Sequence, residues 1–256
     1  TGPTADGFDA AQVDRGLAVV EQVAASPVLR SFDALGHSIG GAQPSLQGSG
    51  RFLAAIRTVA GLVAPGLNAA LVPIIQAPSL GRTFVYQAGT NTYAVDPART
   101  GAPPNGVRFI LYELASNGAL TATEIGYADL VDEQAGSLTS AGLRLTVVSG
   151  STTHLDYHFT LAGTIATASV GVNGYLSNGT ERVNFEITTT GQLFGRAGPV
   201  TFDARLEVPS EDFVVTANVT GEAGQTNGDG VMAFTVQSHT DVLLINPRDQ
   251  LAKDLK

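Results

Sequence analysis

A change in hydrophobic periodicity near Gly81 constrains the fold of this chain more than any other feature. Beyond that point, apolar and polar residues alternate with a period of two, as in the segment with Val183, Phe185 and Ile187 on one side. The same alternation recurs over 155–161, 200–206 and 213–219. Each segment therefore has one apolar and one polar face, which is typical of an antiparallel sheet with one solvated side.

Asn-Gly pairs punctuate this half of the chain, and this dipeptide supplies the positive φ values of a two-residue hairpin turn. The pairs begin at Asn105, Asn117, Asn173, Asn178 and Asn227. About a dozen strands are expected, near 82–87, 91–95, 107–114, 123–131, 143–149, 153–161, 163–170, 171–177, 180–189, 200–207, 211–220 and 231–245, where the last range holds one strand or two. No helical pattern separates them, which favours a meander over parallel strand–helix–strand units.

The first eighty residues instead carry the periodicity of helices. The apolar stripe of a helix over 10–25 is predicted to consist of Val13, Leu17, Val20 and Val23, with Val19 broadening it. Ser26-Pro27 is expected to end this helix. Further helices are predicted over 28–35 and 51–63, joined by a glycine-rich loop.

Helices followed by a long run of strands predict an α+β protein. N-terminal helices are expected to pack on the apolar face of a long antiparallel β-meander that forms a barrel, a half-barrel or a sandwich. We expect a flexible linker at 1–8, a helical part at 9–80, a β part at 81–246 and a C-terminal tail at 247–256. One domain containing both parts is favoured, and two domains divided near Gly81 are the alternative.

Composition excludes several classes of function. The net charge is −9, and both lysines, Lys253 and Lys256, lie at the C-terminal end, so the basic cluster that nucleic acid requires is missing. Adsorption to an anionic membrane surface is disfavoured for the same reason. Cysteine is absent, which excludes disulfides and Cys-ligated zinc. No membrane span is predicted, because Arg57, Asn68, glycines and prolines interrupt the most apolar stretch, 52–75.

The chain opens on a polar stretch, Thr1 to Gly7, without an initiator Met. A mature N-terminus left by removal of an export signal has this character, and a shortened chain is the alternative. We therefore expect an extracytoplasmic protein, whether periplasmic, cell-surface or secreted. A lipid anchor ahead of this stretch, as in a bacterial lipoprotein, is compatible with the sequence.

The stretch Gly36-His37-Ser38-Ile39-Gly40 fits the pattern G-x-S-x-G. With its flanks it resembles the nucleophile elbow of α/β-hydrolases such as lipases and esterases. The resemblance implies Ser38 as nucleophile, His239 as base, and Asp203, Asp212 or Asp229 as the third member, with Asp229 our choice.

The context of Ser38 favours a different interpretation. An elbow serine leaves a central strand and enters a helix, but Pro44 and the glycines that follow it do not continue a helix. Only 35 residues precede Gly36, and they carry a helical pattern. A helix that ends at Gly36, with the glycine as its C-terminal cap, explains the same letters.

His154, Asp156 and His158 form a second candidate site. They share one face of a predicted strand, with Leu155 and Tyr157 on the other. Two imidazoles and a carboxylate are suitable ligands for a divalent metal such as zinc or copper, or for iron. The alternative is a solvated polar face. No other cofactor is expected.

The sequence favours a non-enzymatic protein that binds a hydrophobic or lipid-like ligand in the cavity of a barrel or half-barrel. With one Met, no Trp and many alanines and glycines, the chain can leave space unfilled beneath its helices. The layout is similar to that of periplasmic lipoprotein carriers of the open-barrel kind. The alternatives are a structural surface protein that self-associates, and a serine esterase using Ser38.

Overall fold

The fold is described from a computed structural model. It describes residues 10–39, 75, 77–133, 140–163, 168–191, 198–223, 234–235, 241–246 and 251–255. For 10, 37–39, 221–223 and the segments from 234 onward, only the course of the backbone is described. The helix predicted over 51–63 lies outside these residues, as do Asp229 and His239.

Helix α1 (Ala10–Ala24) buries a face built around Gly16, Val19 and Val23. The predicted stripe is wrong at Leu17, which is 51% exposed. The reason is a close approach to the sheet, because a Cβ at position 16 would overlap the ring of Phe213. Glycine therefore lets the helix lie directly on a strand, and this contact sets which residues of α1 turn inward.

Helix α2 (Pro27–Ile39) follows after a short break at Ala25 and Ser26. Pro27 begins this helix, since proline needs no intrahelical partner for its nitrogen in the first turn. The helix also runs past its predicted end and through Gly36, so the expectation of a glycine cap at that residue is wrong. Val28, Leu29 and Leu35 bury its inner face.

The strands form one mixed, mostly antiparallel sheet with the order β13-β12-β10-β9-β8-β7-β6-β5-β4-β3-β1-β2, and β11 pairs with β10. Only β1 and β3 are parallel among the described pairs. The strands are β1 (Arg82–Gln87), β2 (Thr92–Val95), β3 (Gly106–Leu114), β4 (Leu120–Asp132), β5 (Ser140–Ser149), β6 (Thr152–Gly163), β7 (Ala168–Ser177), β8 (Arg182–Gly191), β9 (Gly198–Val208), β10 (Phe213–Ala223), β11 (Phe234–Thr235), β12 (Asp241–Asn246) and β13 (Leu251–Leu255). Two short 3-10 turns, η1 (Ala77–Ser79) and η2 (Pro209–Glu211), precede β1 and β10.

Two strand predictions need correction. One strand, β7, replaces the two predicted over 163–170 and 171–177. The Asn173-Gly174 pair, which the dipeptide pattern predicts as a turn, lies within this strand. At Gly174, φ is +154°, and a Cβ would overlap the carbonyl oxygen of Asp156 on β6. The predicted C-terminal tail also contains a strand, β13, which pairs with β12.

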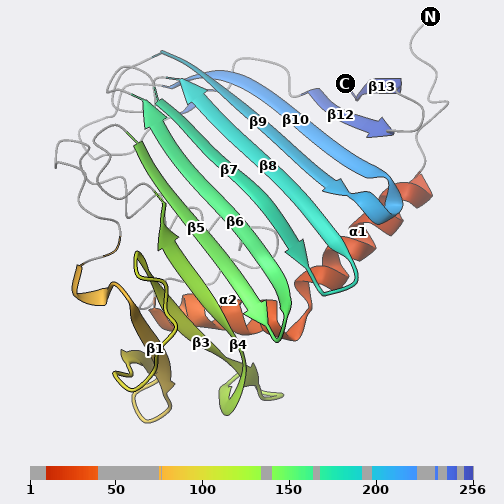
Figure 1. The fold of residues 1–256 in the computed structure, drawn as a ribbon. Helices are drawn as coiled ribbons and strands as arrows, with labels where there is room; N and C mark the ends of the chain where they lie inside the picture. Colours follow the sequence, from red (N-terminus) through yellow and green to blue (C-terminus); the bar gives the residue numbers. More distant parts are fainter. Residues whose placement is uncertain are drawn as a thin grey trace, which may run out of the picture.

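The predicted α+β layout is confirmed, with helices along one end of a curved sheet (Figure 1). Helix α1 contacts β7 to β10 and the turn η2, while α2 contacts β2 to β6. Both helices lie near the hairpin ends that join β5 to β6 and β7 to β8 (Figure 1). Among the described residues, no helix is long and apolar enough to cross a membrane.

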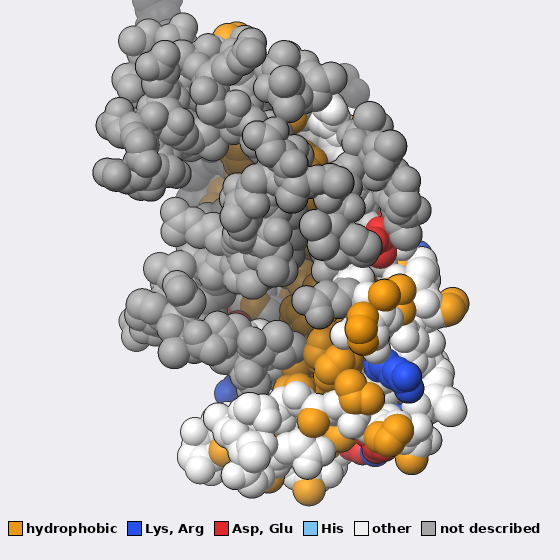
Figure 2. Space-filling model, turned by 90° about the vertical axis from the view of Figure 1, so that its left-hand side faces the viewer, with side chains coloured by type: hydrophobic (Ala, Val, Ile, Leu, Met, Phe, Trp, Pro, Cys, Tyr) orange, Lys and Arg blue, Asp and Glu red, His pale blue; other side chains and the backbone are white. Residues whose placement is uncertain are grey.

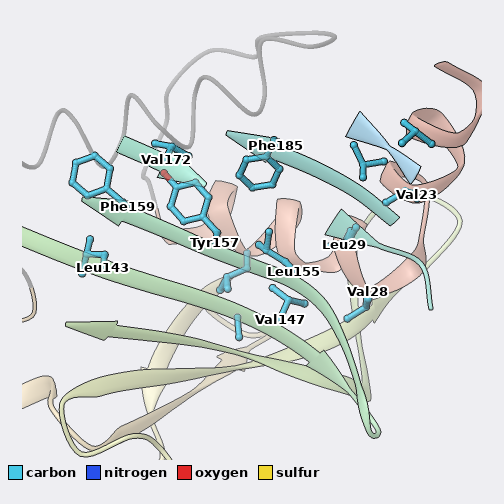
Figure 3. Packing of buried hydrophobic residues seen from close by; sticks show 14 of the residues in the cluster. Val23, Val28, Leu29, Leu143, Val147, Leu155, Tyr157, Phe159, Val172 and Phe185 are labelled. Carbon is cyan, nitrogen blue, oxygen red and sulfur yellow. The ribbon is translucent and has the colours of Figure 1, made fainter. Parts of the chain in front are cut away.

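One hydrophobic cluster joins the helices to the sheet. Val147 on β5 and Leu155 on β6 are almost fully buried in the same cluster as Val23 of α1 and Val28 of α2 (Figure 3). Val183 on β8 belongs to this cluster as well. Tyr157 and Phe185 extend this cluster along the sheet, with ring centroids 6.2 Å apart. The apolar alternation read from the sequence therefore corresponds to the inner face of the sheet.

Candidate functional site

The feature that stands out on the sheet is an apolar strip that is only half-buried. It lies on β7 to β10, on the face that the helices cover at one end. We call it the open strip, and its residues are Val170, Ile187, Phe202, Ala204, Leu206, Val215, Ala217 and Val219. Soluble proteins seldom leave a contiguous apolar surface accessible unless it binds something.

The pairing register shows that these residues are neighbours. Ile187 lies opposite Ala204, and Ala204 lies opposite Ala217, so three strands contribute one row. Directly paired residues of an antiparallel sheet point to the same face, with Cβ atoms about 5 Å apart. A second row joins Leu206 to Val215. The strip is thus one continuous surface.

Burial falls along the strands from the helices toward the strip. Val183, Val208 and Phe213 lie at the helix end and are 0 to 4% exposed. Beyond them, Ile187 on β8 and Ala204 on β9 are half-buried. Farther along the same face, Val200 on β9 and Ala168 on β7 are buried again, so the half-buried strip lies between two buried rows.

Small side chains set the shape of the strip. Ala204 and Ala217 form the middle of one row, and the larger Phe202 and Leu206 stand on either side of Ala204 along β9. Alanine leaves the surface lower than its neighbours, so an apolar group can approach the backbone there. Figure 2 shows hydrophobic side chains gathered over the described part of the face drawn.

Tyr157 adds an aromatic group to the same face of the sheet, beside Phe185 (Figure 3). Burial raises the pKa of its phenol to about 12. The phenol therefore stays neutral at physiological pH, so this tyrosine contributes no charge to the apolar face.

The candidate metal ligands lie on the opposite, polar face of β6. His154 donates from Nδ1 to the carbonyl oxygen of Ser177 at 2.9 Å. In His158, Nδ1 lies 3.2 Å from Glu133 Oε2, and Nε2 lies 3.3 Å from Asp156 Oδ1. Both ring nitrogens of His158 thus contact carboxylates, and the two nitrogens of one imidazole ring cannot bind the same metal ion. These contacts therefore do not bring His154, Asp156 and His158 together around one point.

Asp156 is bound by a cation of the protein itself. Arg144 on β5 donates two hydrogen bonds to its carboxylate, at 2.9 and 2.8 Å. The Arg144 guanidinium holds the pKa of the Asp156 carboxyl below its usual value. Within the described part of the chain, no group of His, Asp or Glu side chains is placed to hold a metal ion. The metal site stays a prediction, and the alternative of a solvated polar face fits these contacts more simply.

Ser38 lies in the last turn of α2, and its side chain is outside the described residues. Its partners in the predicted triad, Asp229 and His239, are outside them as well. The backbone around Ser38 is helical, whereas an elbow requires a sharp turn from a strand into a helix. The hydrolase interpretation stays a prediction, and the strand-to-helix turn that it requires at Ser38 is replaced by a helix.

The open strip itself was missed as a site in the sequence. Its side chains were recognised as the apolar face of predicted strands, but alternation alone cannot distinguish a filled core from an accessible surface. The sequence feature that could indicate an accessible surface is the pair of alanines, Ala204 and Ala217, among larger apolar residues. Their meaning depends on the register that places them side by side.

Comparisons with known protein families, with curated proteins and with solved structures give no match for this chain.

Proposed function

We propose that this protein binds a hydrophobic or lipid-like ligand on the open strip, next to the part of the sheet that the helices cover. The single observation that supports the proposal is the contiguous half-buried apolar surface over β7 to β10. It lies beside a well-packed core and not at a chain end, so it is part of the folded architecture. The extracytoplasmic location expected from the sequence stays a prediction.

The physical basis of binding would be the transfer of apolar surface out of water. Such burial contributes about 25 cal/mol per Å² of apolar area. The lining of the strip is aliphatic or aromatic, with Thr189 the polar member of its outer row, opposite Phe202. A ligand held there needs an extended apolar part and gains little from charge, which is the chemistry of an acyl chain.

Self-association is the alternative occupant of the same surface. A second copy could bury the strip, and the short edge strand β2, where Val95 is 43% exposed, offers a further contact. Ligand binding is favoured because the low row at Ala204 and Ala217 lies within a curved face (Figure 1) and leaves room for an apolar group beside the backbone.

Native mass spectrometry of the protein purified without detergent separates the two. The proposal predicts a monomer that carries a co-purified species of lipid mass, removable by organic extraction. A ladder of oligomers with no bound small molecule would favour assembly and contradict the proposal.

A matched pair of variants locates the ligand. Ala204→Phe fills the low row on the open strip, whereas Thr188→Phe adds the same ring on the opposite face of the neighbouring strand. Loss of the co-purified species in the first variant alone is expected. Equal loss in both would place the ligand elsewhere.

A further inference from the structure

A basin of about 320 Å³ lies on the polar face of the sheet, over β7, β8 and β9. Its polar lining is Asn173, Arg182, Asn184, Glu186, Arg205 and Glu207. The basin is on the other side of the sheet from the open strip, so the two surfaces are separate.

The backbone of Gly174 forms part of the lining. At this residue β7 closely approaches β6, and a Cβ would overlap the carbonyl oxygen of Asp156. Its φ of +154° is one that residues with side chains seldom adopt. The basin thus coincides with a local irregularity of the sheet that depends on glycine.

Arg182 is held in a fixed orientation at one end of the basin. Its Nε donates to Asn184 Oδ1 at 2.6 Å, and its guanidinium carbon lies 3.7 Å from the centre of the Tyr175 ring. These two contacts fix the plane of the guanidinium and leave its terminal amino groups available. Stacking on an aromatic ring and bidentate donation are the properties that suit arginine to carboxylate recognition.

Several other arginines of the sheet have anionic partners. Arg108 pairs with Asp129 and Arg144 with Asp156, each through two hydrogen bonds. Among the described residues, no carboxylate lies at ion-pair distance from Arg182, although its charge contributes to lowering the pKa of the nearby Asp156 carboxyl. Its charge is therefore oriented but not neutralised by direct contact.

The rest of the basin indicates which kind of anion fits. Glu207 lies 3.5 Å from Arg205, and Glu186 is directly opposite Arg205 in the register. With Arg182, the lining holds two cations and two carboxylates, so its formal charge is zero. A dianion would be repelled by the carboxylates, whereas a monoanion with hydroxyl groups could use them and the Asn184 amide as hydrogen-bond partners.

We propose that this basin binds a small hydroxylated monocarboxylate of the sugar-acid class. Its carboxylate pairs with the terminal amino groups of Arg182, and its hydroxyls bond to Asn184 and Glu207. The proposal is independent of ligand binding on the open strip.

The test is an NMR titration of the full ¹⁵N-labelled chain with glucuronate, following the side-chain resonances of Asn184 and Arg182. Glucose is the neutral probe, and inorganic phosphate is the anion without hydroxylated carbon. We expect saturable shifts with glucuronate, with a Kd on the order of 1 mM. Arg182→Gln should weaken binding about tenfold or more, because it removes a charge-assisted pair.

Two variants separate recognition from a structural effect. Arg182→Lys keeps the charge but lacks the planar fork, so it should bind with intermediate affinity. Arg82→Gln removes an exposed arginine on β1, away from the basin, and should bind as the parent does. The thermal midpoint of each variant shows whether the fold is retained.

Four results would each overturn the proposal. They are equal binding of glucose, tighter binding of phosphate than of glucuronate, unchanged affinity in a folded Arg182→Gln protein, and absence of a saturable shift with glucuronate.

Discussion

The hydroxyl of Ser31 on α2 binds both main-chain polar groups of Tyr112 on β3. Its Oγ donates to the Tyr112 carbonyl oxygen at 2.6 Å and accepts from the Tyr112 amide at 3.1 Å. The pairing of β3 with β4 shifts register on either side of Tyr112, and β1 pairs with β3 only as far as Phe109. One helix side chain thus replaces a missing strand partner.

Replacing Ser31 with Ala is expected to lower the free energy of unfolding by about 1–3 kcal/mol, because two buried main-chain groups lose their partner. Ser31 is 0% exposed, so water cannot take its place. Chemical denaturation measures the loss. Arg30→Ala, on the exposed side of the same helix, is the control and should change stability by about 0.5 kcal/mol or less. Equal losses in both would refute the role of the hydroxyl.

Two glycines in the helices are expected to respond to replacement by alanine with opposite changes in stability. Gly16→Ala should destabilise the protein by about 1–3 kcal/mol, since the new Cβ would overlap the Phe213 ring. Gly36→Ala meets nothing within 4 Å and should stabilise α2 by up to about 1 kcal/mol. Thermal unfolding of both variants checks this. If Gly16→Ala were as stable as the parent, α1 would not lie as close to β10 as described.

Acid should weaken the contact between β5 and β6 through Asp156. Its pKa is lower in the folded protein than in the unfolded chain, chiefly because Arg144 donates hydrogen bonds to it. The folded state therefore gains stability from this carboxylate at pH values above its pKa in the unfolded chain, which is about 3.9. That gain is lost as pH falls through the lower folded pKa.

The measurement is the free energy of unfolding of the parent and of Asp156→Asn between about pH 6 and pH 2. The parent should be more stable at the upper end, and the difference should shrink toward zero at the lower end. A difference that stayed constant across the range would show that the pairing with Arg144 contributes nothing.

A fluorophosphonate probe tests the esterase alternative. We expect no labelling that depends on Ser38, because this residue lies in a helix and not at a nucleophile elbow. The native protein and Ser38→Ala should give the same result. Labelling of the native protein that disappears in Ser38→Ala would revive the hydrolase interpretation.

Much of the sheet could be predicted because alternation fixes both the strands and their inner faces. The residues predicted to share a face with Phe213 and Val215 do so in the structure. The Asn-Gly rule succeeded only in part at Asn117 and Asn178, which lie between paired strands but in links longer than two residues, with positive φ at the glycine alone. It failed at Asn173-Gly174, because positive φ there serves a close approach between strands and not a turn.

The parts that could not be predicted depend on contacts between distant residues. The inward face of α1 is set by Gly16 against Phe213, about two hundred residues away in the chain. The spacing of His154, Asp156 and His158 predicts a metal site. In the structure, Arg144 on the neighbouring strand donates hydrogen bonds to the carboxylate of Asp156, the middle residue of the three. Accessibility of the open strip likewise depends on register and helix placement.

The most direct test of the account is a titration of the purified, delipidated protein with a fluorescent fatty-acid probe. The parent should bind saturably, Ala204→Phe should bind about tenfold more weakly or not at all because it fills the low row, and Thr188→Phe should bind like the parent. Saturable binding that Ala204→Phe leaves unchanged, or absence of binding to the parent, would contradict ligand binding on the open strip.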